Sequence, residues 1–176
     1  MTEETGVPFL STKLHIPPRR PGLVSRPRLV ARLDQALSSQ HRLTLVSAKA
    51  GMGKTTLVSD WLHRQERPAQ WLSLDESDSD PRRFVSYLLA ALGQAGLQSK
   101  MNHLEAPQLP PMEALVTELI NEVASIGKPF LLVLDDYHLI QNEWIHQAVG
   151  YLATLSRPGG KRRIEGTLAP LQEHRE

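Results

Sequence analysis

The chain has 176 residues, 40% of them hydrophobic and 22% charged, and its formal net charge of +1 gives no reason to expect a polyanion partner. The lack of cysteine excludes disulfides and cysteine-ligated zinc sites. No apolar run approaches the ~20 residues that span a bilayer, and the acidic N-terminus does not resemble a signal peptide, so we expect one cytoplasmic domain without a membrane partner.

The first half of the chain predicts an arm, a helix, and a strand followed by a second helix. Prolines suppress helix and central strand over residues 1–23, which we expect to form an extended arm. Apolar residues then recur at helical spacing over 27–37, and the short apolar run 42–47 is typical of a buried strand. A helix is expected to follow over 54–65.

The second half repeats this alternation and ends in a segment of different composition. The expected elements are a strand over 69–74, a helix from Pro81 capped by Asp80, a loop over 95–111, a helix over 113–126 ended by Gly127, a strand over 130–134 and a helix over 143–155. Strands that alternate with helices predict a parallel α/β sheet. From Ser156 the chain is polar and rich in turn residues, so we expect a core over 24–155 and a disordered tail over 156–176.

A glycine-rich motif lies between the first strand and the helix that follows it. Residues 48–55 match the phosphate-binding loop of nucleotide-binding proteins, with Ala48 in place of the first glycine. Gly51 and Gly53 let the backbone curl so that its N–H groups face phosphate oxygens, next to a helix N-terminus that attracts anions. The alternative is an ordinary turn with a solvated lysine, but the strand–loop–helix context is the one that nucleotide binding requires.

The side chains of this loop predict ATP or ADP with Mg²⁺ as the ligand. Lys54 supplies a mobile cation for the β- and γ-phosphates, the Thr55 hydroxyl can ligate Mg²⁺, and Thr56 falls near the α-phosphate. The nucleotide-binding residues expected here are Ala48, Lys49, Ala50, Gly51, Met52, Gly53, Lys54, Thr55 and Thr56.

Two acidic residues end the apolar run 130–134, in the pattern of a Walker B segment. A buried strand delivers Asp135 to the carboxyl edge of the sheet, where a carboxylate can hold Mg²⁺ together with Thr55. Asp136 can then orient or deprotonate the attacking water, so that Asp136 and Lys54 are the candidate catalytic residues. The alternative is a pair of acids in a strand-to-helix turn, one of them a helix cap.

With both motifs placed, the chain resembles the N-terminal ATPases of MalT-type, LuxR-related transcriptional activators, which belong to the signal-transduction (STAND) ATPases. The resemblance covers roughly residues 8–155. The segments that carry it are 10–18, 23–29, 46–61, 71–75, 84–92 and 132–138. It implies a RecA/AAA-like P-loop NTPase core, with Val24 near the adenine and Arg26 near the nucleotide. An ordinary junction between arm and helix is the alternative for these two residues.

The resemblance also implies a function: an ATP-binding switch domain of a transcriptional regulator. Hydrolysis is expected to be slow and confined to the intact parent, which could form a homo-oligomer in its ATP state and bind DNA through domains absent from this chain. Two alternatives stay open. One is a non-catalytic nucleotide-binding interaction module or inactive fragment, and the other is a metabolic P-loop kinase.

After residue 155 the chain departs from the family, so we expect the core to be incomplete. In such ATPases the strand after Walker B lies between the Walker A and Walker B strands. The nearest substitute, 163–168, is short and polar and has a glycine within the run, which suits a buried strand poorly. We therefore expect marginal stability. The alternatives are that 163–168 enters the gap or that the flanking strands pair directly.

Overall fold

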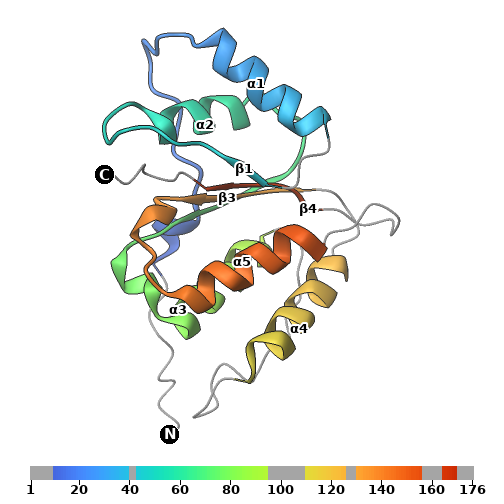
Figure 1. Cartoon of the computed structure of the whole chain (residues 1–176). Helices are drawn as coiled ribbons and strands as arrows, with labels where there is room; N and C mark the ends of the chain where they lie inside the picture. Colours follow the sequence, from blue (N-terminus) through green and yellow to red (C-terminus); the bar gives the residue numbers. More distant parts are fainter. Residues whose placement is uncertain (1–9, 40–42, 95–109, 126–129, 156–163, 170–176) are drawn as a thin grey trace, which may run out of the picture.

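A computed structural model describes residues 10–39, 43–94, 110–125, 130–155 and 164–169. These residues form a parallel sheet with helices α1 and α2 on one face and α3, α4 and α5 on the other (Figure 1). The elements are η1 (Ser11–Leu14), α1 (Pro27–Ser38), β1 (Leu43–Leu45), α2 (Lys54–Leu62), β2 (Ala69–Ser73), η2 (Glu76–Ser79), α3 (Pro81–Gly93), α4 (Met112–Ser125), β3 (Phe130–Asp135), η4 (Tyr137–Leu139), α5 (Glu143–Leu155) and β4 (Ile164–Ala169).

The helix and strand positions predicted up to residue 155 are confirmed, with changes of a few residues at their ends. The start of α3 is a clear case, since the Asp80 carboxylate accepts a hydrogen bond from the Arg83 N–H at 2.9 Å and Pro81 occupies the first turn. The arm differs from expectation, because Ser11–Leu14 forms a 3-10 turn within it. Residues 95–109 of the loop predicted over 95–111 lie outside the described residues, as does the helix stop predicted at Gly127.

The order of strands in the sheet is β1-β4-β3-β2, and every neighbouring pair is parallel. Thr167 of β4 lies opposite Leu43 of β1 on one side and opposite Leu132 of β3 on the other. For residues 164–169 the expectation of a disordered tail is therefore wrong, and the alternative that this segment enters the gap is the one observed. The rest of the tail, 156–163 and 170–176, lies outside the described residues.

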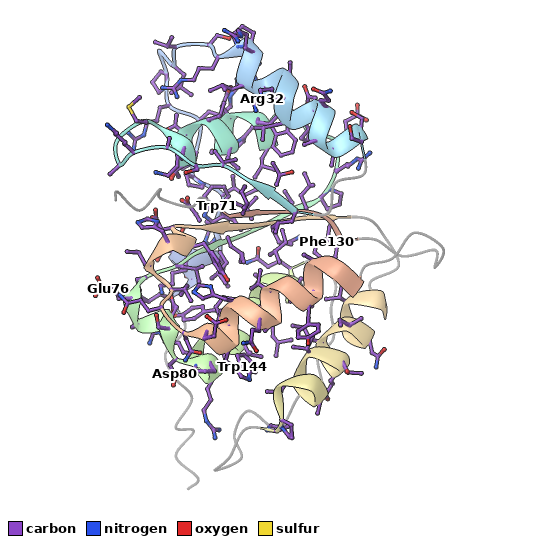
Figure 2. All side chains as sticks on the ribbon, viewed as in Figure 1. Arg32, Trp71, Glu76, Asp80, Phe130 and Trp144 are labelled. Carbon is purple, nitrogen blue, oxygen red and sulfur yellow. The ribbon has the colours of Figure 1, made fainter. Side chains whose placement is uncertain are left out.

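The alternation of side chains along β3 divides the core into two parts. Phe130, Leu132 and Leu134 pack toward α3, α4 and α5, while Leu131 and Val133 pack toward α1 and α2. Successive residues of a strand point to opposite faces, so a fully apolar strand fills both cores at once. Figure 2 shows the result, with Trp71 and Phe130 on opposite sides of the sheet. The buried strand β3 thus fixes the position of its carboxyl end, which carries the acidic pair.

None of the described helices is long and apolar enough to cross a membrane.

The central position of β4 predicts a large effect of proline at residue 167. In a strand with neighbours on both sides every backbone N–H is needed for hydrogen bonding. Thr167→Pro removes one of these donors, and its ring should clash with the neighbouring strand. We expect the free energy of unfolding to fall by about 1–3 kcal/mol per hydrogen bond lost. Thermal melts followed by circular dichroism measure this, with Thr167→Val, which keeps the N–H, as the control. A proline variant that melts like the parent would contradict the central placement of β4.

Candidate functional site

The loop between β1 and α2 has the curled backbone that its glycines predict. Gly51 and Gly53 both have φ of 77°, in the left-handed region that side chains other than glycine rarely adopt. Gly53 forms the N-cap of α2, and the Met52 N–H closes the loop by donating to the Lys49 carbonyl at 3.3 Å. The first N–H groups of a helix have no partner within the helix, so this loop opens onto unpaired donors.

Lys54 lies across the loop that it ends. Its ammonium donates to the Ala48 carbonyl at 2.8 Å and to the Lys49 carbonyl at 3.4 Å. The side chain therefore folds back over the concave side of the loop instead of extending into solvent. A partly buried ammonium in this position is well placed to exchange carbonyl oxygens for the stronger acceptors of a phosphate.

Thr55 and Asp135 are brought together from positions far apart in the chain. The Thr55 hydroxyl lies 2.9 Å and 3.1 Å from the two carboxylate oxygens of Asp135, to which it donates. Asp135 is only 6% exposed. Its burial, and secondarily the neighbouring charge of Asp136, raises the pKa of Asp135 above its usual value, so that a cation at this place would relieve an unfavourable buried charge.

The donor set fits a metal that arrives with its own oxygen ligands. Within the described parts of the chain, no cluster of three or more His, Asp or Glu side chains could hold a metal by itself. Thr55 and Asp135 would supply two oxygens, whereas Mg²⁺ requires six. The remaining ligands would come from phosphates and water, which is how Mg²⁺ is held in phosphoryl-transfer sites.

Asp136 occupies an unusual backbone conformation directly after β3. With φ of 56°, it is the one non-glycine residue with positive φ among those described. It stands at the N-cap of η4 but makes no side-chain capping hydrogen bond, so the helix-cap alternative for this acid finds no support. Its carboxylate is about half exposed, and His138 Nδ1 lies 3.9 Å away. Strain of this kind in a non-glycine residue is a common feature of functional sites.

Arg26 also lies against the phosphate loop, whereas Val24 does not pack in the core. The Arg26 guanidinium donates to the Met52 carbonyl at 2.8 Å. A Cβ atom on Gly53 would stand 3.3 Å from the same guanidinium, so a side chain there would require Arg26 to shift slightly, in addition to the strained φ. Val24 is 83% exposed on the arm.

A cavity of about 260 Å³ separates the arm from the first turns of α2. Its walls bring Thr55 and Thr56 together with arm residues that the sequence motifs had not identified as part of a site. The lining residues are Pro17, Pro18, Arg19, Arg20, Leu23, Thr55, Thr56, Ser59 and Asp60. The sequence signal for this wall was the proline-rich arm itself, which belongs to the family resemblance but carries no recognisable ligand-binding motif.

Comparisons with known proteins show the family to which this fold belongs. A family model described as "AAA ATPase domain" matches residues 23–162. The HTH-type transcriptional regulator MalT of Serratia proteamaculans is 43% identical over 146 residues, which cover 81% of this chain and 16% of that protein. The MalT proteins of Cronobacter sakazakii and Yersinia pestis are 41% identical over the same length and share of each chain.

This chain spans 16% of the length of these curated relatives. The expected α/β fold of a P-loop NTPase is confirmed by the family match and by the parallel sheet with its flanking helices. The similarity to MalT extends over most of the chain and includes both the phosphate loop and the acid that faces it. On these grounds the chain belongs to the AAA ATPase domain family, as a MalT-type member.

Proposed function

We propose that this chain is an ATP-binding switch domain of a MalT-type transcriptional regulator and that it binds Mg-ATP between the phosphate loop and the end of β3. The contact of Thr55 with Asp135 at 2.9 Å carries the proposal. It joins the Thr55 hydroxyl, which could ligate Mg²⁺, to a buried carboxylate whose pKa is raised by its burial. A glycine-rich turn of purely structural purpose would not require this pairing.

The residues around this contact would bind different parts of the nucleotide. Lys54 and the loop N–H groups would bind the β- and γ-phosphates, and Thr55 with Asp135 would hold Mg²⁺. Asp136 would orient the attacking water, because its carboxylate follows the metal-binding acid and stays accessible. The cavity beside Thr56 could receive the nucleoside, with Arg26 at the loop and Val24 near the adenine.

The intact protein would use this domain to switch between ADP-bound and ATP-bound forms in the cytoplasm. Slow hydrolysis would reset the switch, and an ATP-bound form could assemble as a homo-oligomer. The relatives are described as HTH-type regulators, so DNA would be bound through parts of the parent protein that this chain does not include.

Replacing Lys54 by alanine tests the phosphate loop directly. Lys54→Ala removes the mobile cation aimed at the phosphates, and charge-assisted hydrogen bonds of this kind are worth ~1.5–3 kcal/mol. The affinity for Mg-ATP should therefore fall on the order of ten- to a hundredfold in titration calorimetry. Arg32→Ala, which removes the same charge from an exposed position on α1 (Figure 2), should leave the affinity unchanged. Equal affinity of Lys54→Ala and the parent would remove the phosphate-loop assignment.

The two acids should separate by role when each is made neutral at constant size. In a longer protein that also carries the domains following this one in MalT-type regulators, Asp136→Asn should bind ATP normally and lose hydrolysis. Asp135→Asn should instead weaken the dependence of ATP binding on Mg²⁺, because it removes a metal ligand. Steady-state ATPase rates and calorimetry at varied Mg²⁺ measure both effects. Hydrolysis by Asp136→Asn at the parental rate would refute its role, whereas a parent without measurable hydrolysis would favour a module that only binds nucleotide.

A further inference from the structure

The arm that lines the cavity is held to the domain by a buried cluster of charges. The Lys13 ammonium lies 2.5 Å from an Asp78 oxygen and 2.6 Å from an Asp75 oxygen. Asp78 is fully buried, and its second oxygen accepts from Arg83 Nε at 3.0 Å. Two cations thus balance two anions, and the arm contributes Lys13 to the cluster. Lys13 is itself buried, which is rare for lysine unless it is paired.

The chemistry of the cluster indicates a firm attachment of the arm. Burial alone would lower the pKa of Lys13, but its hydrogen bonds to Asp75 and Asp78 outweigh this and raise that pKa above its usual value. The hydrogen bond from Lys13, followed by one from Ser77, lowers the pKa of Asp75 to about 2. Next to the cluster, the Leu10 N–H donates to the Tyr87 hydroxyl at 3.1 Å, which fixes the arm on α3 a second time.

Directly after this anchor, the arm crosses from one face of the sheet to the other. Leu14 is part of the core that faces α3, α4 and α5, while Ile16 packs against the core that faces α1 and α2. Figure 1 shows this course, with the arm rising from below the sheet to reach α1 above it. The arm then continues as the cavity wall, where Pro17 accepts a hydrogen bond from the Ser59 hydroxyl and Arg19 contacts Asp60 at 2.7 Å.

The anchor is also connected to the acidic end of β3. The Leu74 N–H donates to the Asp135 carbonyl at 3.0 Å, and Asp75 of the cluster is the next residue in the chain. The same short turn after β2 therefore supports both the arm and the backbone of the acid that faces Thr55. The cluster is thus connected to the cavity wall through the arm, and to Asp135, which faces the phosphate loop, through the turn after β2.

We propose that Lys13 is a positioning residue for the nucleotide, which holds the wall 17–23 at the distance from Thr55 and Thr56 that a bound nucleoside requires. The proposal rests on the proposed function, since it assigns the cavity beside the phosphate loop to the nucleoside part of that ligand. Lys13 does not line the cavity, so we expect it to act on the cavity wall through the arm. Arg26 occupies the N-cap position of α1, which packs on α2, so we expect it to keep its place when the anchor is lost.

The experiment compares two ligands that share phosphates and differ in the nucleoside. Titration calorimetry of the whole chain gives affinities for Mg-ATP and for Mg-tripolyphosphate. Lys13→Met should lower the affinity for Mg-ATP on the order of tenfold, the usual size of an effect that acts through a supporting residue. The affinity for Mg-tripolyphosphate should not change. If the cluster serves stability alone, the affinities for both ligands will fall together or neither will, and either result overturns the proposal.

A second variant decides the question if Lys13→Met does not fold. Asp75→Asn keeps the shape of the side chain and its capping of η2 but removes one anion from Lys13, at a residue that is about half exposed. It should lower the affinity for Mg-ATP in the same selective way and by a smaller factor. An unchanged ratio of the two affinities in this folded variant overturns the proposal as well.

A control variant and the unmodified parent chain distinguish a failure of the positioning role from a failure of the proposed function. Asp80→Asn alters a nearby cap of α3 without touching the arm, and it should change neither affinity. Binding of Mg-ATP by the parent together with non-selective effects of Lys13→Met and Asp75→Asn rejects the positioning role and leaves nucleotide binding intact. A parent chain that binds neither ligand rejects the proposed function and the positioning role with it.

Discussion

The contact between the Thr55 hydroxyl and the Asp135 carboxylate is the point on which the rest of the structure depends. It requires that β1 and β3 run parallel, with their carboxyl ends at the same edge of the sheet, so that the loop after one meets the acid at the end of the other. β4 separates these strands and pairs with both, which sets their spacing and register. A buried carboxylate then faces the loop, where a cation would offset the cost of its burial.

The elements of the fold up to residue 155 could be predicted because the signals were local. Proline and capping residues marked helix starts such as Asp80–Pro81, and the apolar run of β3 identified a strand buried on both faces. The central strand β4 could not be predicted with the same ease. Its segment is polar and contains Gly166, so its place comes from the unpaired edges of β1 and β3 and not from its own composition.

In the candidate site, too, the features that depend on neighbouring residues could be predicted from the sequence, and those that depend on distant residues were harder to predict. The left-handed glycines of the loop and the position of Lys54 can be inferred from the motif, since each depends on neighbouring residues. The pairing of Thr55 with Asp135 needed the parallel sheet as well. The cavity wall of the arm was not predicted, because prolines exclude helix without saying what the extended chain will contact. Its contacts include those of Lys13, whose partners lie more than sixty residues away in the sequence.

The most direct measurement of the central claim is the location of the metal in solution. Mn²⁺ can replace Mg²⁺ and broadens the NMR signals of nearby nuclei, so it reports which amides surround the ion. With ATP present, the amide signals of Thr55 and Asp135 should broaden first, and without ATP they should remain sharp, because the chain alone offers too few oxygen ligands. Broadening centred on other residues, or equal broadening without ATP, would contradict a Mg-ATP site between the phosphate loop and β3.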